Sequence, residues 1–390
     1  MAVTEYGLWP KKIITGPGSI DKIGAEVAAL GGKKIIFFSD SFLSTTDMVK
    51  KPIEKLTADG FEVVLFGDIE ANPTEDMVMA GVELMKSFRP DAIVVIGGGS
   101  PLDCAKAVNV VYTHGDHVSK YNVNLGGSRF IEDKLLPMIA VPTTAGTGSE
   151  VTAVGVITGS KTHIKYGIAH PLLIPDIAIL DANLTLGLPP RTTANTGIDA
   201  LTHLIEAYVS KVNSPFADGM CIKGMKMILE ALPRAYKDGN DIEARDIMIQ
   251  ASCIAGIAFT INGLGLCHQM AHQLSGYFNT AHGLANAMLI PHVMRFNRKA
   301  QPQKFADIAE ALGVDVRGLS VEEAGLKGIE KVEELCRSLG VPEYLDEIGI
   351  DKARVHDMAI TALQDGVGMN NPIKTTVEEC EALYLECFKN

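Results

Sequence analysis

The feature that most restricts the possible folds of this chain is a change of periodicity near its middle. Before the change, short apolar runs alternate with helical stretches; KKIIFFSD, FEVVLFGD and DAIVVIGGGS are three such runs, and 74–88 is one such helix. Further strands are expected at LLPMIAVP, at VTAVGVIT with a hairpin after it, and at DIAILD. Uninterrupted apolar strands joined by helices are typical of a parallel sheet covered by helices, so the pattern predicts an α/β fold here.

No strand-like run follows Asp181 in the rest of the chain. From Pro190 onward apolar residues recur at helical spacing, most clearly in DIMIQASCIAGIAFTING and KGIEKVEELCRSLG. The break falls in ANLTLGLPP, at 182–190. We therefore predict an α/β domain with a parallel sheet over residues 1–185 and an all-helical domain over 186–390, a division that suits a chain of 390 residues.

Composition argues against several kinds of partner and location. The formal net charge of −12 does not favour a nucleic acid or an anionic membrane surface as a partner. The N-terminal MAVTEYGLWPKK has no apolar core of a secretion signal, and no apolar run approaches the roughly 18 residues of a membrane span. The seven cysteines include no CxxC pair, and several have apolar neighbours. We expect reduced core thiols in a cytoplasmic protein.

A glycine-rich segment, IVVIGGGSPLDCAK, has the order strand, three glycines, helix. The glycines at 97–99 permit a tight turn, Ser100 is the predicted N-cap, Pro101 fits the first helical position, and Asp103 lies three residues after the cap. The free N–H groups at such a helix start suit a pyrophosphate. The segment is not GxGxxG, however, and a capped helix after a strand, with no ligand, is the alternative.

Two other positions fit a dinucleotide. PTTAGTGSE, at 142–150, is a second glycine- and threonine-rich loop after a strand, and its hydroxyl and N–H groups would complete a diphosphate cradle. Asp40 ends an earlier strand, where a carboxylate accepts hydrogen bonds from ribose hydroxyls and repels a 2′-phosphate. These residues predict NAD rather than NADP. The alternatives are an ordinary flexible turn and a plain cap for the next helix.

Acidic and histidine residues cluster in two segments of the helical half. Asp199 and His203 are four apart in GIDALTHLIEAY, His268 and His272 are four apart in a later helix, and His282 begins the next helix. Such side chains in apolar helices need partners, and a divalent cation would satisfy several together. One carboxylate with imidazoles and no thiolate suits Fe²⁺, Mn²⁺, Ni²⁺ or Zn²⁺, and the spacing does not choose among them. Hydrogen-bonded core histidines are the alternative.

With these motifs the chain resembles the iron-containing (group III) alcohol dehydrogenases over essentially its whole length. The resemblance rests on GGGSPLDCAK, PTTAGTGSEVT, GIDALTHLIEAY and CHQMAHQLSGYFNTAHGLANAMLIPHVMRFN, which occur in the order of that family. It implies a dinucleotide-binding α/β domain, a metal-binding helical domain, and NAD(H)-linked hydride transfer to or from a small alcohol, diol or anionic aldehyde. The implied metal is Fe²⁺, with Zn²⁺, Mn²⁺ or Ni²⁺ as alternatives, acting as a Lewis acid.

The resemblance also implies roles for single residues. The metal ligands would be Asp199, His203, His268 and His282, while His272 would be a nearby non-ligand that relays a proton or only packs. The NAD contacts would be Asp40, Asn72, Gly97, Gly98, Gly99, Ser100, Thr143, Thr144, Thr147, Lys165 and Leu184. Of these, Lys165 and Leu184 lie outside the strongest motifs.

The sequence departs from the family at two places that we expect to line the substrate pocket. DGVGMNNP, at 365–372, has no cysteine where many members have one, and Cys267 precedes His268 where relatives vary. The substrate can therefore not be carried over from the resemblance. Two alternative functions are a dehydroquinate-synthase-like NAD and metal enzyme, and a non-catalytic nucleotide- or metal-binding module. The family also implies a homo-oligomer, a dimer or larger, and the strand near KKIIT could pair across a two-fold axis.

Overall fold

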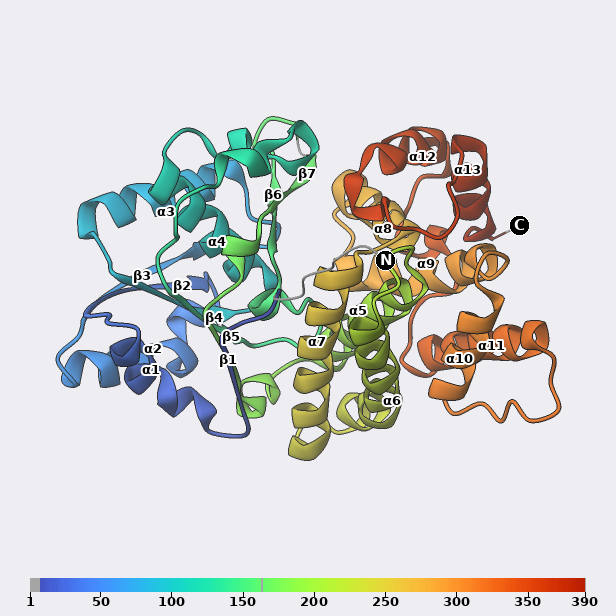
Figure 1. Ribbon diagram of the computed structural model, residues 1–390, viewed down its shortest axis with the longest axis horizontal. Helices are drawn as coiled ribbons and strands as arrows, with labels where there is room; N and C mark the ends of the chain where they lie inside the picture. Colours follow the sequence, from blue (N-terminus) through green and yellow to red (C-terminus); the bar gives the residue numbers. More distant parts are fainter. Residues whose placement is uncertain (1–7, 163, 390) are drawn as a thin grey trace. The chain divides into compact units, whose positions relative to one another are not determined.

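The computed structural model describes residues 8–162 and 164–389 (Figure 1). The chain forms two compact units, Met1–Leu186 and Gly187–Asn390. The first seven residues, part of the stretch in which we expect no secretion signal, lie outside the described residues.

The N-terminal unit contains a six-stranded, fully parallel sheet, as the apolar runs predicted. In spatial order its strands are β1 (Lys12–Thr15), β8 (Ile177–Leu180), β5 (Met138–Pro142), β4 (Ala92–Gly97), β2 (Lys34–Asp40) and β3 (Glu62–Ile69). The predicted hairpin forms a separate antiparallel pair, β6 (Val154–Thr158) and β7 (Lys165–Ala169). The α/β fold class of this half is confirmed.

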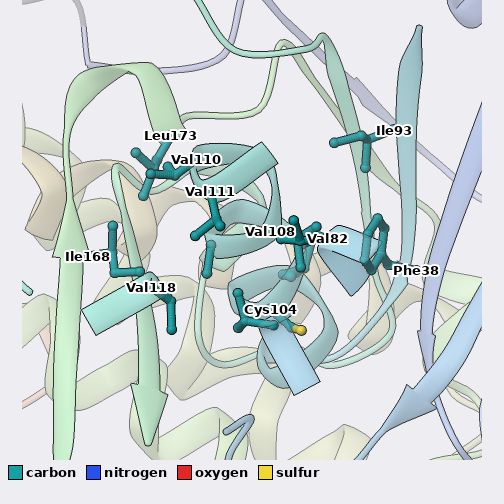
Figure 2. Packing of buried hydrophobic residues seen from close by; sticks show 14 of the residues in the cluster. Phe38, Val82, Ile93, Cys104, Val108, Val110, Val111, Val118, Ile168 and Leu173 are labelled. Carbon is teal, nitrogen blue, oxygen red and sulfur yellow. The ribbon is translucent and has the colours of Figure 1, made fainter. Parts of the chain in front are cut away.

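Helices cover both faces of the parallel sheet. They are α1 (Ile23–Ala29), α2 (Asp47–Ala58), α3 (Glu75–Phe88) and α4 (Gly99–His114). Alternate residues of β2 enter different cores: Phe38 packs with α3 and α4, whereas Phe37 packs with α1 and α2. Figure 2 shows Phe38 beside Val82 and Val108 in the first of these cores. Burial on both faces explains why the strands read as continuous apolar runs.

Short 3-10 helices connect these elements. They are η1 (Ser19–Lys22), η2 (Leu43–Thr45), η3 (Val118–Tyr121), η4 (Val123–Leu125), η5 (Gly127–Phe130), η6 (Ser149–Val151), η7 (Pro171–Leu173) and η8 (Ala182–Thr185).

The C-terminal unit is helical throughout its described residues, which confirms the second half of the predicted fold. Its helices are α5 (Pro190–Val209), α6 (Pro215–Lys237), α7 (Ile242–Asn262), α8 (Leu266–Phe278), α9 (His282–Asn297), α10 (Pro302–Ala311), α11 (Val321–Ser338), α12 (Val355–Gln364) and α13 (Val377–Glu386). Its 3-10 helices are η9 (Leu345–Ile348), η10 (Lys352–Arg354) and η11 (Gly366–Gly368).

Helix α5 is central to this unit, and every residue from 197 to 209 is buried. It packs against α6, α7 and α9. Gly197 allows the close approach of α6, because a Cβ atom there would lie 2.3 Å from Cδ1 of Leu232. The segment that contains Asp199 and His203 is therefore buried inside this unit.

Among the described residues, α7 is the one helix long and apolar enough to cross a membrane by length and composition alone. Of its most apolar stretch, 67% is buried inside the protein, which is the burial of a core helix. All seven cysteines lie within the described residues, are buried and form no disulfide, as expected for core thiols.

Candidate metal centre and dinucleotide loops

Three of the predicted ligands converge in the C-terminal unit: Asp199 from α5, His268 from α8 and His282 from the first position of α9. Nε2 of His282 lies 3.6 Å from Oδ1 of Asp199, and Nε2 of His268 lies 3.8 Å from the same oxygen. The three donor atoms are all within 4.8 Å of one another. Asp199 and His268 are buried, whereas 28% of the His282 side chain is exposed, so the cluster is enclosed but reachable at His282.

A glycine brings the start of α9 onto α5. A Cβ atom on Gly283 would lie only 2.2 Å from the backbone oxygen of Asn195, one turn before Asp199. A glycine is therefore required directly after His282, and this close approach places the imidazole beside the carboxylate.

His203, the fourth predicted ligand, is not part of this group of three. Its ring stacks on that of His268, with centroids 4.5 Å apart and planes at 19°, and on Phe259, with centroids 4.6 Å apart. Its role as a ligand stays a prediction.

His272 lies one turn after His268 on α8, and its ring centroid is 5.3 Å from that of His282. Its Nδ1 atom is 2.6 Å from Oδ2 of Asp365, a partner that the sequence analysis did not identify. Asp365 is largely buried, and burial raises its pKa, but the hydrogen bond and charge of His272 outweigh burial and lower it below its ordinary value.

The electrostatics of the cluster favour bound positive charge. Burial disfavours the ionised form of Asp199, yet the imidazoles of His203, His282 and His268 hold its pKa well below the usual range. Burial also lowers the pKa of His268, but Glu206 and Asp199 raise it to about 9. Two buried carboxylates thus face the imidazoles from one helix, and their negative charge favours positive charge at this cluster.

A buried amide also reaches this cluster. Nδ2 of Asn286 lies 2.7 Å from Oδ1 of Asp199 and 3.2 Å from Nε2 of both His268 and His282. One point inside the protein is therefore within hydrogen-bond distance of all three donor atoms. Oxygen and imidazole nitrogen donors around such a point, with no thiolate among them, fit Fe²⁺, Zn²⁺ and similar divalent ions.

In the N-terminal unit three strands that lead into the predicted dinucleotide segments end on the same side of the sheet. Asp40, Gly97 and Pro142 are the last residues of β2, β4 and β5, which are neighbouring parallel strands. Chain order reverses between β2 and β4, since β3 lies outside β2 and β5 lies outside β4. Ligands of open parallel sheets bind beyond the carboxyl ends of the strands at such a switch point.

The two glycine-rich loops touch each other there. The N–H of Thr143 donates to the backbone oxygen of Gly97 at 3.0 Å. A Cβ atom on Gly99 would lie 2.9 Å from Cγ2 of Thr147, and one on Gly98 would lie 3.4 Å from Cγ2 of Thr144. Glycine at 99 thus lets the two loops approach each other closely, and their backbone N–H groups are of the kind that binds a diphosphate.

The predicted cap of α4 is wrong. The helix begins at Gly99 with Gly98 as its N-cap and has no side-chain cap, so Ser100 already lies in its first turn. Asp103 does not form a capping box, because its oxygens accept hydrogen bonds from Ser149 Oγ at 2.7 Å and from the N–H of Val156 at 3.0 Å. Buried donors of the neighbouring segment outcompete the helix start for this carboxylate.

The remaining predicted NAD residues have varied surroundings. Oδ1 of Asp40 accepts hydrogen bonds from the N–H groups of Phe42 and Leu43, as the capping alternative expects. Asn72 has a left-handed backbone, with φ of 58°. Lys165 begins β7, and Leu184, in η8, is buried in the core beside α1 and α2.

Comparison with protein families identifies the chain. The model described as iron-containing alcohol dehydrogenase matches residues 10–182, and that described as the C-terminal part of the Fe-containing alcohol dehydrogenase family matches 193–388. The chain belongs to the iron-containing alcohol dehydrogenase family. It is therefore an oxidoreductase, and neither the dehydroquinate-synthase-like alternative nor the non-catalytic one is supported.

Members of the iron-containing alcohol dehydrogenase family align with the chain from end to end. The 1,3-propanediol dehydrogenase of Klebsiella pneumoniae is 38% identical over 98% of both chains, and the NAD-dependent methanol dehydrogenase of Bacillus methanolicus is 36% identical over 97% of this chain and 98% of its own. The crystal structure of a 1,3-propanediol oxidoreductase superposes with a TM-score of 0.96 at 38% identity, covering 99% of this chain and 100% of that one.

One position expected to line the substrate pocket of this family member does not face solvent. Cys267 is fully buried, and its Sγ atom lies 3.6 Å from the backbone oxygen of Asn286. It therefore packs within the core, and burial raises the pKa of its thiol well above the ordinary value. In the 365–372 segment, by contrast, Asp365 contacts His272 and Met369 is 71% exposed.

Three residues around the centre were not predicted from the sequence: Glu206, Asn286 and Asp365. Signals for the first two existed, since Glu206 lies on the same face of α5 as Asp199, and Asn286 lies one turn after His282. Asp365 is 93 residues from its partner His272, and no spacing rule connects them.

Proposed function

We propose that this iron-containing alcohol dehydrogenase interconverts a small alcohol and its aldehyde, using NAD(H) and a divalent metal, with Fe²⁺ as the first candidate. The observation that carries the proposal is the convergence of Asp199, His268 and His282 on one point within the C-terminal unit. An oxygen and two imidazole nitrogens form a donor set of the kind that holds catalytic Fe²⁺ or Zn²⁺.

The ligand residues hold the metal, with His203 proposed as a fourth ligand. Bound there, a divalent ion supplies Lewis acidity toward the oxygen of the substrate. Asp199 contributes the negative charge, and its enclosed position keeps water from competing for it. His282 is the ligand on the exposed side, where a small substrate has access.

The dinucleotide is proposed to bind at the switch point of the N-terminal unit. The two loops would hold the diphosphate through backbone N–H and hydroxyl groups, and Asp40 would accept from the adenosine ribose. The proposed contacts are Asp40, Asn72, Gly97, Gly98, Gly99, Ser100, Thr143, Thr144, Thr147, Lys165 and Leu184. The close approach of the two loops at Gly99 and Thr147 supports the diphosphate part of this assignment.

His272 is proposed to exchange a proton with the substrate. Its Nδ1 atom is held by Asp365, so Nε2 is the nitrogen that can give a proton to an aldehyde oxygen or take one from an alcohol. A residue that only packs or orients its neighbours is the alternative.

The substrate class proposed is a short-chain alcohol, a diol or a small anionic aldehyde. The relatives are named for different substrates, 1,3-propanediol, methanol and choline among them, so the choice must be measured. Metal-free protein reloaded with Fe²⁺ without oxygen would be screened for NADH oxidation over small aldehydes, hydroxyaldehydes and sulfoacetaldehyde. Turnover that depends on added metal is expected, and equal rates with and without a chelator would contradict the proposal.

Asp40 is expected to select NADH over NADPH. Asp40→Asn keeps an oxygen that can accept from Phe42 and Leu43 but removes the charge that repels a 2′-phosphate. The ratio of kcat/KM for the two cofactors should therefore narrow by about ten-fold, roughly 1.4 kcal/mol. A wild-type protein that used NADPH at least as well as NADH would overturn the assignment.

A dimer or larger homo-oligomer is proposed for the cytoplasmic protein. Within the described residues β1 is an edge strand of the sheet, and Ile13 on it is 40% exposed. Light scattering at micromolar concentration tests this, and a monomer would remove the proposal.

A further inference from the structure

A buried carboxylate beside the metal centre has no task in the function proposed above. Glu206 lies on α5, two turns after Asp199, and only 3% of it is exposed. Its Oε2 atom is 2.5 Å from Nδ1 of His268, and its Oε1 atom accepts a hydrogen bond from the N–H of Cys267 at 2.7 Å. Both partners belong to the first turn of α8, the helix that carries a proposed ligand.

The first contact determines which ring nitrogen of His268 carries a proton. An ionised carboxylate only accepts, so Nδ1 of His268 is the protonated nitrogen. In the neutral ring the lone pair is then on Nε2, the atom that faces Asp199. The amide nitrogen of Asn286 agrees with this, because it donates to Asp199 and lies 3.2 Å from the same Nε2. A carboxylate that holds a metal-binding histidine in this way fixes its tautomer and ring orientation.

The second contact positions the start of α8. Its N-cap, Gly265, offers no side-chain cap, and two acceptors from elsewhere take over: Oδ1 of Asn371 accepts from the N–H of Leu266 at 3.1 Å, and Glu206 accepts from Cys267. A Cβ atom on Gly265 would lie 2.8 Å from Oδ1 of Asn371 and 2.9 Å from Oε1 of Glu206. Only glycine leaves room for both acceptors at this helix start.

We propose that Glu206 is a positioning residue of the metal centre, which sets the tautomer and orientation of His268 and anchors the turn that bears it. The proposal rests on the proposed function, in that His268 is taken to be a ligand. Glu206 does not touch the reacting atoms and acts through the imidazole.

The substitution Glu206→Gln separates the contact with His268 from the contact with Cys267. The backbone N–H of Cys267 can only donate, so the carbonyl oxygen of the new side chain stays with it. The amide NH₂ group then faces Nδ1 of His268 and must donate to it. The ring is driven to the tautomer with its proton on Nε2, the nitrogen that the metal needs, while the cap of α8 is preserved.

Asn371→Ala is the matched control. It removes the other acceptor of the same helix turn, and the contacts of Asn371 are with Leu266, Asn297 and Ile373 rather than with an imidazole. It tests whether any loose anchoring of α8 weakens metal binding as much as the wrong tautomer does.

The experiment measures Zn²⁺ affinity by chelator competition, the absorption spectrum of the Co²⁺ form, and the unfolding temperature of the metal-free full-length protein. Wild type, Glu206→Gln, Asn371→Ala and His268→Ala are compared. Glu206→Gln should bind Zn²⁺ about 10- to 100-fold more weakly than wild type and shift the Co²⁺ spectrum, with an unfolding temperature close to that of wild type. Asn371→Ala should lower the unfolding temperature but keep Zn²⁺ affinity within about three-fold of wild type.

Three results would overturn the proposal in different ways. Wild-type affinity and spectrum in Glu206→Gln, with metal lost in His268→Ala, would remove the role of Glu206 and leave the metal centre standing. Equal weakening in Asn371→Ala and Glu206→Gln would show that helix anchoring alone matters. Equal Zn²⁺ binding by wild type and His268→Ala would instead remove the proposed centre, and this inference with it.

Discussion

Both units bury ionisable side chains, but the partners of these side chains differ between the two units. In the N-terminal unit, Nζ of the fully buried Lys106 donates to Ser149, to Thr152 and to the backbone oxygen of Val154, at 2.8–3.1 Å. Asp103 accepts from Ser149 and from a backbone N–H of the same segment. Each donor of Lys106, Ser149 and Thr152 has an acceptor within the protein. These residues and Asp103, which we call the closed cluster, attach α4 to the segment 149–156.

In the C-terminal unit the comparable buried group is Asp199, His268 and His282, which we call the acceptor cluster. Oδ1 of Asp199 and Nε2 of His268 and His282 all face the single amide nitrogen of Asn286. An amide nitrogen carries two protons, so it cannot donate to all three atoms when both imidazoles accept at Nε2. The difference between the two clusters is therefore one of geometry: the donors of the first are satisfied within the protein, whereas the ligand atoms of the second converge on one point.

The proposed difference between the two clusters would be refuted most directly if His268 were not needed for metal binding. His268→Ala should lose bound metal and lower kcat/KM by about a thousand-fold, because the charge stabilisation contributed by the metal goes with it. Lys106→Met, which opens the closed cluster, should leave metal content per folded protein at the wild-type level. Metal analysis after dialysis and an NADH assay measure both. Full metal content in His268→Ala would show that the acceptor cluster is not the site.

Metal binding should stabilise only the protein that has the acceptor cluster intact. Zn²⁺ at 100 to 1,000 times its dissociation constant should add about 3–4 kcal/mol to the free energy of unfolding, since it binds the native state. Calorimetry with and without chelator would show a higher transition temperature in wild type and no change in His268→Ala. A similar rise in both proteins would mean that Zn²⁺ binds elsewhere.

The buried carboxylate of Glu150, beside the closed cluster, should make the free energy of unfolding depend on pH. Burial raises the pKa of Glu150, which lies beside Lys106, from 4.5 to about 7. The native state therefore binds this proton more tightly than the unfolded state does. The resulting contribution to the free energy of unfolding is fully present below pH 4.5 and is lost as the pH rises to about 7. Glu150→Gln should equal wild type near pH 4 and gain about 3 kcal/mol relative to it at pH 7.5. Unfolding curves across this range measure the difference, and a pH-independent difference would contradict the raised pKa.

Lys106 provides a control, because its buried charge should change the free energy of unfolding at higher pH and in the opposite direction. Burial lowers its pKa from 10.5 to about 8, so its charge destabilises the native state below pH 8 and this effect fades as pH rises to 10.5. The stability of Lys106→Met relative to wild type should therefore fall as the pH rises from 8 to 10.5.

The smallest expected effect concerns His272, at the rim of the acceptor cluster. His272→Ala should keep one metal per chain, lower kcat by about ten-fold and change the pH profile of kcat, because a proton relay is lost. Asp365→Asn should change the pH profile in the same direction, since Asp365 holds Nδ1 of the ring. Loss of metal as complete as in His268→Ala would show that His272 is a ligand, and full activity would leave it only a packing role.

The fold was predictable because each strand and helix carries its own periodicity. Strands such as β4 are buried on both faces and therefore read as unbroken apolar runs, and the helices of the second unit keep the spacing of an apolar stripe. The start of α4 was mispredicted because Ser100 has the right chemistry for a cap, whereas the backbone of Gly98 and the buried partners of Asp103 decide the outcome.

The candidate site was predictable only where spacing along one helix is informative. Spacing shows that Asp199 and His203 share one face of α5 and that His268 and His272 share one face of α8. It does not show that His268 and His282 meet Asp199 while His203 stacks on the ring of His268. That arrangement depends on how three helices pack, for which Gly283 and its contact with Asn195 matter as much as any ligand.

The three donor atoms come from helices that are far apart along the chain, with α6 and α7 between the first and the second. During synthesis on the ribosome, Asp199 emerges long before His282, and neither can hold an ion strongly by itself. The centre can therefore be filled only after α9 has been made and has docked on α5. Which metal the enzyme carries is then decided by the ions that the finished protein meets in its compartment, and growth conditions during expression should change the occupant without any change in the polypeptide.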